Sequence, residues 1–147
     1  MSTEPKTRIL LVEDEIITAT ALEKSLRNLG YDVVGIISSG EAAIRQAAEK
    51  VPDLILMDIR LQGEMDGISA TQKIQFNLEI PVVYLTAHSD EGTVERILDS
   101  KPYGCLFKPF DEEDLRNAVE GALAWRRRTG PGRNRKDQLS WVSQSPT

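Results

Sequence analysis

Short runs of apolar, mostly β-branched residues recur along the chain and predict strands. The four clearest runs lie at residues 9–12, 33–37, 54–57 and 82–85, and a weaker fifth run lies at 103–107. Most of them are continuously apolar rather than alternating, which is typical of strands covered on both faces of a parallel sheet. The pattern therefore predicts a parallel sheet that is buried between two layers of helices.

Helical periodicity fills the intervals between these runs. Apolar residues step by three and four positions through residues 19–29 and stop at Gly30, a natural end for a helix. Ser38, with Glu41 three positions later, resembles a capping box and predicts the start of a second helix. A last apolar face runs through residues 115–123. Strand and helix thus alternate five times, which predicts a three-layer α/β domain with right-handed crossovers.

Composition limits what such a domain can be. The chain has 147 residues, of which 40% are hydrophobic and 28% charged, so it can form one packed domain of ordinary size. Its net charge of -5 argues against binding to nucleic-acid phosphates. Its single cysteine, Cys105, excludes an internal disulfide. Without an apolar run long enough for a membrane helix or a signal core, we predict a cytoplasmic domain that binds neither membrane nor nucleic acid.

Charge divides the chain into two parts. Residues 126–147 hold six basic and one acidic side chain, a net charge of +5, whereas the preceding residues hold 12 basic and 22 acidic ones, a net charge of -10. The helix-breaking sequence Thr-Gly-Pro-Gly at 129–132 falls at the same place. We therefore predict a folded domain over 1–128 and a flexible basic tail or linker over 129–147. Trp141 in that tail is either a docking residue or the beginning of a further segment.

Polar side chains follow four of the five predicted strands. Glu13 and Asp14 follow the first, Asp58 ends the third, Thr86 follows the fourth and Lys108 follows the fifth. Because the carboxyl ends of parallel strands meet at one edge of a sheet, we expect these side chains to converge there. Taken singly, the residues have ordinary explanations, such as a helix cap for Asp14 or a surface charge for Lys108. Their joint position predicts a site.

The residue types indicate the chemistry of that site. Three carboxylates at close range repel one another unless a cation lies among them. Oxygen ligands without a nearby histidine or cysteine favour a hard cation, and few carboxylates leave room for water and phosphate, as Mg²⁺ requires. A lysine and a hydroxyl opposite the carboxylates suit the oxygens of a phosphoryl group.

Five short motifs connect these residues to a known family. They are Val12-Glu13-Asp14-Glu15, Leu56-Met57-Asp58, Met65-Asp66-Gly67, Leu85-Thr86-Ala87 and Phe107-Lys108-Pro109-Phe110. In this order and spacing, over about residues 7–127, the chain resembles a response-regulator receiver domain of two-component signalling. The resemblance implies a flavodoxin-like sheet of strand order 2-1-3-4-5.

The resemblance also implies roles for the residues of the site. Asp58 would accept a phosphoryl group from a sensor histidine kinase or a histidine phosphotransfer protein, and Thr86 and Lys108 would bind the phosphoryl oxygens. The Lys108–Pro109 bond would be cis. Such a domain is a switch rather than an enzyme, although it phosphorylates itself from small phosphodonors and slowly loses the group again. Phosphorylation would displace Thr86 and alter the face formed by the fourth and fifth strands and helices.

A metal site follows from the same resemblance. Glu13, Asp14 and Asp58, together with the backbone carbonyl of Arg60, would hold Mg²⁺ or Mn²⁺, with Glu13 acting through water. The loop after Asp58 lacks the proline that is common in the family and is one residue longer than the commonest form. Because Gly63 and Gly67 supply backbone freedom in this loop, we expect the metal site to be retained.

The chain departs from the family at one position of the proposed switch. Cys105 stands three residues before Lys108, where family members usually carry an aromatic residue. Tyr103, two residues earlier and predicted on the same strand face, is a candidate substitute. Cys105 itself is expected to be a small buried apolar residue rather than a redox sensor.

Several alternatives remain open from sequence alone. An aspartyl phosphatase would need a second acid where this chain has Arg60, and a flavin-binding protein would meet repulsion from the acids at 13–15. A degenerate receiver that serves only as an interaction module is kept open by Cys105. The chain is either a single-domain receiver or the N-terminal receiver of a longer multidomain regulator, and its downstream effector is unspecified.

Overall fold

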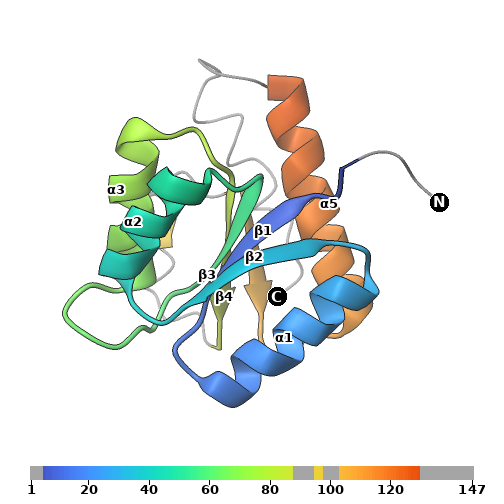
Figure 1. Cartoon of the computed structure of the whole chain (residues 1–147), viewed down its shortest axis with the longest axis horizontal. Helices are drawn as coiled ribbons and strands as arrows, with labels where there is room; N and C mark the ends of the chain where they lie inside the picture. The colour runs from blue at the N-terminus through green and yellow to red at the C-terminus, as the bar shows by residue number, and fades with distance from the viewer. Residues whose placement is uncertain (1–4, 88–94, 98–102, 130–147) are drawn as a thin grey trace.

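A five-stranded parallel sheet forms the centre of the protein (Figure 1). The computed structural model describes residues 5–87, 95–97 and 103–129. The strands are β1 (Arg8–Val12), β2 (Asp32–Ile37), β3 (Leu54–Asp58), β4 (Val82–Thr86) and β5 (Gly104–Phe107). Their order is β2-β1-β3-β4-β5, and every neighbouring pair is parallel. The predicted flavodoxin-like α/β fold and its strand order are confirmed.

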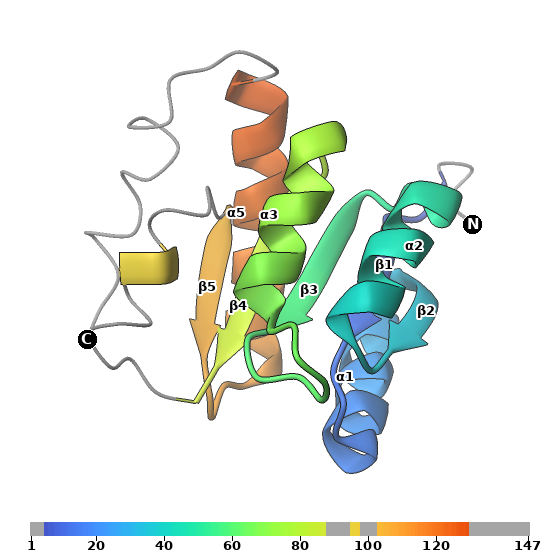
Figure 2. The same cartoon turned by 90° about the vertical axis from the view of Figure 1, so that its left-hand side faces the viewer.

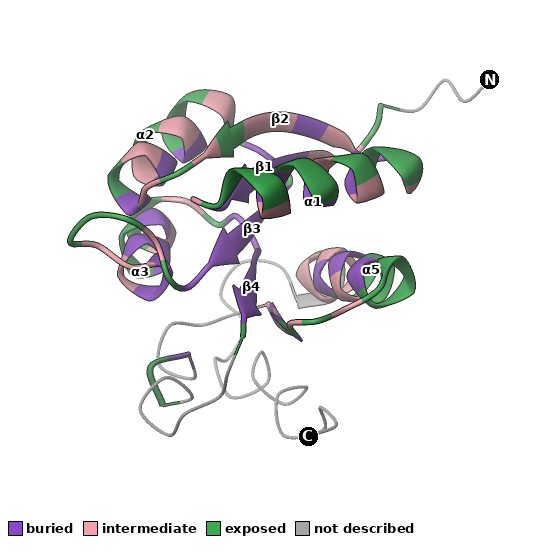
Figure 3. Ribbon diagram, turned by 90° about the horizontal axis from the view of Figure 1, so that it is seen from below, coloured by how far each residue is buried: buried purple, intermediate pink, exposed green. Residues whose placement is uncertain are grey.

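Helices cover both faces of the sheet (Figures 2 and 3). They are α1 (Ile16–Asn28), α2 (Gly40–Lys50), α3 (Gly67–Asn77) and α5 (Glu112–Thr129). Helices α1 and α5 lie on one face and α2 and α3 on the other, as Figure 3 shows. The helix predicted between β4 and β5 is described only at residues 95–97, which are helical.

Each face of the sheet has its own apolar core. Leu22 and Leu26 of α1 and Val119 of α5 pack against one face. Ala47 of α2 and Ile74 of α3 pack against the other. All residues of β3 and β4 are buried, whereas the edge strand β2 is only partly covered. The continuously apolar runs therefore mark strands that are buried on both faces.

The end of α1 agrees with the sequence prediction. Gly30 adopts a φ of 94°, and its N–H donates to the carbonyl of Arg27 at 3.0 Å. The N–H of Tyr31 donates to the carbonyl of Leu26 at 3.0 Å. These two bonds satisfy carbonyls that a helix end leaves free, and the left-handed φ between them favours glycine.

The start of α2 corrects the predicted capping box. The N-cap is Ser39, whose hydroxyl accepts a hydrogen bond from the N–H of Ala42 at 3.2 Å. The prediction of Ser38 as the cap was wrong by one residue, which also moves Glu41 out of the capping-box position. The reason is tertiary: Ser39 is still extended and forms a β-bridge with Gln62 in the loop after β3.

The boundary of the folded part stays a prediction. Helix α5 extends to Thr129, and the rest of the predicted tail, with Trp141, lies outside the described residues. Within the part of the chain that the structure describes, no helix has both the length and the apolar character needed to cross a membrane.

Candidate functional site

The carboxyl ends of four strands bring the predicted site residues to one edge of the sheet. Glu13 and Asp14 directly follow β1, Asp58 is the last residue of β3, and Thr86 is the last residue of β4. Lys108 directly follows β5. All five line one cavity of about 350 Å³. The convergence that the sequence predicted is therefore present.

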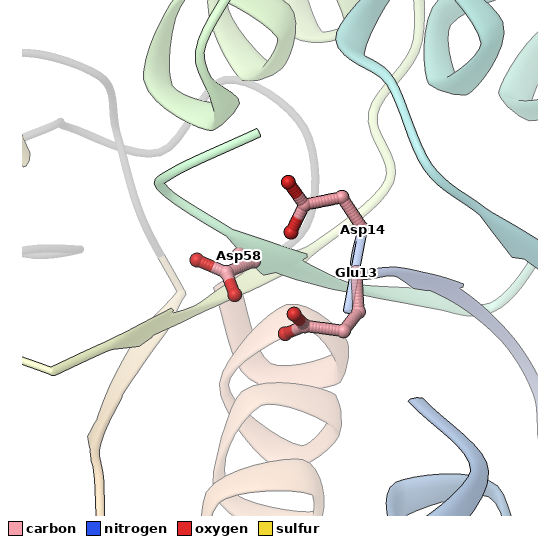
Figure 4. Close-up of side chains that lie close together, drawn as sticks. All are labelled: Glu13, Asp14 and Asp58. Carbon is pink, nitrogen blue, oxygen red and sulfur yellow. The ribbon is translucent and has the colours of Figure 1, made fainter. Parts of the chain in front are cut away.

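The three acids form a close cluster (Figure 4). One carboxylate oxygen from each of Glu13, Asp14 and Asp58 lies within 4.8 Å of the others. Glu13 and Asp58 are buried, with only 4% and 6% of their surface exposed, and Asp14 is half-buried. Asp14 does not cap α1, because the N-cap is Glu15 and its side chain makes no capping bond. The carboxylate of Asp14 thus has no capping role and lies in the acidic cluster.

Burial and repulsion change the protonation of Glu13. Burial, followed by the hydrogen bond and charge of Asp58, raises the pKa of Glu13 from 4.5 to about 7. A hydrogen bond from the N–H of Glu15 at 3.2 Å and the charge of Lys108 oppose this shift without cancelling it. Glu13 is therefore harder to ionise in this cluster than an exposed glutamate.

Lys108 is the cation of the cluster. Its Nζ lies 2.9 Å from Oδ2 of Asp58 and 3.3 Å from Oε2 of Glu13. Burial lowers the pKa of Lys108, but its hydrogen bonds to the two carboxylates and their charges outweigh burial and raise it. The backbone N–H of Lys108 donates to the carbonyl of Thr86 at 2.8 Å, which joins the ends of β4 and β5. The Lys108–Pro109 bond is cis, as predicted.

The loop between β3 and α3 holds Asp58 from the other side. The N–H of Arg60 donates to Oδ1 of Asp58 at 3.0 Å, so both carboxylate oxygens have a donor. Arg60 lines the cavity, whereas a metal-binding role for its carbonyl stays a prediction. The predicted freedom of Gly63 is confirmed by its φ of 93°. Gly67 is needed for a different reason, namely space, because a Cβ there would lie 2.1 Å from the carbonyl oxygen of Asp58.

One contact of this loop was missed in the sequence. Asp66 caps α3 by accepting from the N–H of Ser69 at 2.9 Å, and it also pairs with Arg96 at 2.6 and 3.1 Å. Burial raises the pKa of Asp66, but these donors outweigh it and lower the pKa. An acid before a glycine at a helix start signals the cap. Nothing local signals Arg96, which is 30 residues away.

The predicted substitute for the switch aromatic is not on the expected face. Tyr103 packs against the core under α1 and α5, whereas Cys105 packs against the core under α2 and α3. The prediction of a shared face was wrong because β5 begins at Gly104, so strand alternation does not extend to Tyr103. Burial raises the pKa of Cys105 to about 12, which fits an inert apolar role.

The donor set suits a hard divalent cation. The cluster offers three carboxylates, and neither histidine nor cysteine lines its cavity among the described residues. Burial, together with the hydrogen bond and charge of Asp58, raises the pKa of Glu13 in spite of the opposing charge of Lys108. A divalent cation would supply further positive charge between the three carboxylates, and oxygen ligands match Mg²⁺. An acidic triad of this kind is typical of the Mg²⁺ site of receiver domains.

Fold and site together define a flavodoxin-like domain with an acidic, lysine-bridged site at the carboxyl edge of its sheet. The model of the response regulator receiver domain family matches residues 9–120. The chain belongs to this family, and it is a receiver domain of the two-component response-regulator type.

Curated relatives share the domain but are longer. The transcriptional regulatory protein PdtaR of Mycobacterium tuberculosis is 38% identical over 117 residues, which are 80% of this chain and 57% of that protein. The transcriptional regulatory protein ZraR of Salmonella typhimurium is 40% identical over 126 residues, 85% of this chain and 28% of that protein. The chain thus spans little more than half of one relative and less than a third of the other.

Solved structures share the fold as well. The signal receiver domain of a modulated diguanylate cyclase from Desulfovibrio desulfuricans superposes with a TM-score of 0.79 at 32% identity, covering 84% of this chain and 98% of that one. The N-terminal domain of a response regulator/sensory box/GGDEF protein from Carboxydothermus hydrogenoformans superposes with a TM-score of 0.75 at 40% identity. That match covers 82% of this chain and 97% of the other.

Proposed function

We propose that this chain is a Mg²⁺-dependent signalling switch in which Asp58 accepts a phosphoryl group from a histidine kinase or a histidine phosphotransfer protein. Receiver domains in general accept phosphoryl groups from histidine kinases. The observation that carries the proposal for this chain is the lysine-bridged cluster. Lys108 contacts Asp58 at 2.9 Å in a cavity that also holds two further acids.

The protein groups around Asp58 orient its carboxylate and receive charge. The N–H of Arg60 and the ammonium of Lys108 each hold one oxygen, which limits rotation of the acceptor. As phosphoryl oxygens approach, Lys108 moves its hydrogen bonds from the carboxylate to them, and the hydroxyl of Thr86 binds another. The transition state of phosphoryl transfer is loose, so positioning and charge compensation provide most of the catalysis.

The metal would be held by Glu13, Asp14 and Asp58, with the carbonyl of Arg60 as a fourth protein ligand. When bound, Mg²⁺ neutralises the acids and draws charge from the phosphoryl oxygens. Glu13, whose pKa is about 7, must lose its proton to take part. Mn²⁺ has similar preferences for oxygen ligands and would replace Mg²⁺.

The transfer itself exchanges one bond for another. A carboxylate oxygen of Asp58 attacks phosphorus in line, the P–N bond to the donor histidine breaks, and the imidazole nitrogen keeps the electron pair. The product is an acyl phosphate, which water later cleaves to regenerate the carboxylate and release inorganic phosphate. A receiver is typically a switch rather than an enzyme, so this slow hydrolysis resets it.

The added charge is the signal. Phosphorylation adds about -1.5 to -2 charges at this edge of the sheet, and Thr86 moves toward the new oxygens. We expect the region 82–108 to respond, because Thr86 ends β4 and its carbonyl accepts from Lys108. Since the curated relatives extend beyond the match, an output segment or partner that follows a receiver over 1–128 is part of the proposal.

The test uses the full chain, Mg²⁺ and acetyl phosphate or phosphoramidate. We expect the intact mass to increase by one phosphoryl group, and the increase to be absent with EDTA or in Asp58→Asn. Glu64→Gln is the matched control, because Glu64 is an exposed acid of the same loop and lies outside the cluster. Amide spectra of the labelled protein then show whether residues 82–108 change.

A second candidate is a receiver that acts only as an interaction module. The observation in its favour is the missing switch aromatic, since Cys105 occupies that position and Tyr103 packs on the other face. Labelling of Asp58 without any spectral change in 82–108 supports this second candidate. Absence of Mg²⁺-dependent labelling contradicts the phosphoacceptor proposal.

A further inference from the structure

The edge of the sheet opposite the acidic cluster carries a second cavity. It has a volume of about 710 Å³ and lies where the amino ends of the strands meet the ends of α2, α3 and α5. Most of its wall is apolar, formed by Val51, Pro52, Leu78, Ile80, Pro81 and Leu123. Val51 is 55% exposed and offers its apolar side chain to this cavity. We call this cavity the amino-edge groove.

Four basic side chains surround the amino-edge groove, and two of them have structural roles. The guanidinium of Arg8 donates to the carbonyls of Lys50 and Val51 at 2.8 and 3.1 Å, where it caps the end of α2. Arg126 pairs with Glu79 at 3.6 Å. The other acid of the groove, Asp53, accepts from the backbone N–H of Arg8 at 2.8 Å. These groups are accounted for by the fold.

The other two cations have no such role. Lys6 and Arg127 are exposed, line the groove, and have no carboxylate within ion-pair distance among the described residues. They come from opposite ends of the folded chain, Lys6 before β1 and Arg127 from the last turn of α5. An apolar wall with two free positive charges is complementary to a segment that has an apolar side chain between carboxylates.

Charge also decides between possible occupants. Residues 130–147 contain Arg133, Arg135 and Lys136 against the single acid Asp137, so this segment is repelled by the same cations. A nucleic-acid backbone would pair with the cations of the groove but would leave its apolar wall uncovered. An acidic peptide segment that carries one apolar side chain is complementary both to the cations and to the apolar wall of the groove.

We propose that the amino-edge groove docks a short acidic segment of a partner protein, with one apolar side chain against Val51 and Leu123 and carboxylates on Lys6 and Arg127. The groove and the acidic cluster lie at opposite ends of the strands, so a partner bound here leaves Asp58 accessible to its phosphodonor. Docking at this edge thus contributes to the selection of a partner protein and does not require phosphorylation.

The test titrates the isotope-labelled full chain with the synthetic peptide Glu-Glu-Glu-Leu-Glu-Glu-Glu at low salt. We expect amide shifts at the non-proline residues of 6–8, 51–53, 78–81 and 123–127, and weaker binding when glycine replaces the leucine. The double variant Lys6→Glu/Arg127→Glu should bind at least about tenfold more weakly, since two attractions become repulsions. The matched control is Lys24→Glu/Lys73→Glu, which makes the same charge change at exposed lysines outside the groove.

A second variant keeps the test independent of charge and of folding. Val51→Asn alters the apolar wall at an exposed position without adding a charge, and it should also weaken binding about tenfold. Shifts centred elsewhere, or equal affinity in the charge-reversed and control variants, would overturn the proposal. Shifts of residues 139–142 caused by the charge reversal without peptide would overturn it too, because the chain's own tail would then be the occupant.

Discussion

Charged side chains have different surroundings at the two ends of the strands. At the carboxyl edge, Glu13 and Asp58 are buried beside each other and share one cation, Lys108. At the amino edge, Arg8 and Asp53 are bound to backbone groups and satisfied locally. At the carboxyl edge, Glu13 has a pKa of about 7. At the amino edge, Arg8 and Asp53 have ordinary structural roles.

The difference follows from the parallel topology. When each strand leads into a helix, helix amino ends lie at the carboxyl edge of the sheet and helix carboxyl ends lie at the amino edge. The helix dipole favours anions at the former and cations at the latter. Asp66 at the start of α3 and Arg8 at the end of α2 are examples. The buried acids at the carboxyl edge are therefore the feature on which the proposed metal and phosphoryl site depends.

The largest effect is expected from filling the space beside Asp58. Gly67→Ala would place a Cβ 2.1 Å from the carbonyl oxygen of Asp58, so the loop has to move. We expect a loss of about 3 kcal/mol or more in the free energy of unfolding. Urea denaturation measures it. Gly121→Ala in α5 is the matched control, because nothing lies within 4 Å of that position and the change should stabilise the helix by about 0.5–1 kcal/mol.

Removing Lys108 should destabilise the protein in a way that Mg²⁺ reverses, whereas removing a cation at the amino edge should not. Lys108→Met leaves Glu13 and Asp58 uncompensated, and we expect a loss of about 2 kcal/mol at neutral pH, reduced from fully buried cases because Lys108 is partly exposed. Added Mg²⁺ should restore much of it. Arg8→Met at the amino edge should cost about 1–2 kcal/mol through its lost bonds to carbonyls, with no effect of Mg²⁺. Equal Mg²⁺ responses in both variants would contradict the comparison.

The pH dependence of stability tests the protonation of Glu13. Because the pKa of Glu13 is about 7 in the folded protein and 4.5 is its ordinary value, the folded state binds more protons between these values. The contribution of Glu13 to stability is thus fully present below about pH 4.5 and is lost as the pH rises through 7. Urea titrations across this range should show a slope that Glu13→Gln removes and that Mg²⁺ reduces.

The same ionisation should govern metal affinity. Mg²⁺ binding requires the deprotonated carboxylate, so the affinity should increase from pH 6 to pH 8 around the pKa of about 7. Calorimetric titration at both values measures this change. An affinity that does not vary with pH would show that Glu13 is already ionised without the metal.

The smallest effect sharpens the description of the carboxyl edge. Ser39→Ala removes the cap of α2 and should cost about 1 kcal/mol, whereas Ser38→Ala should have little effect. Thermal unfolding of the two variants distinguishes them. The reverse result would restore the capping box that the sequence predicted.

Sequence alone was sufficient for the fold class, the strand order implied by family resemblance, and the residues that gather at the carboxyl edge. Continuous apolar runs and helical periodicity are local patterns, and parallel topology then requires strand ends to meet. Sequence therefore places the five polar residues of the site, from Glu13 to Lys108, at one edge, and all five line one cavity there.

Tertiary structure decided what depends on distant parts of the chain. The cap of α2 moved to Ser39 because Gln62 pairs with it, and Tyr103 left the face of Cys105 because β5 begins only at Gly104. The Arg96–Asp66 pair and the amino-edge groove join segments that no local pattern connects. Local periodicity specifies which residues are inside, whereas packing alone specifies which neighbours they meet.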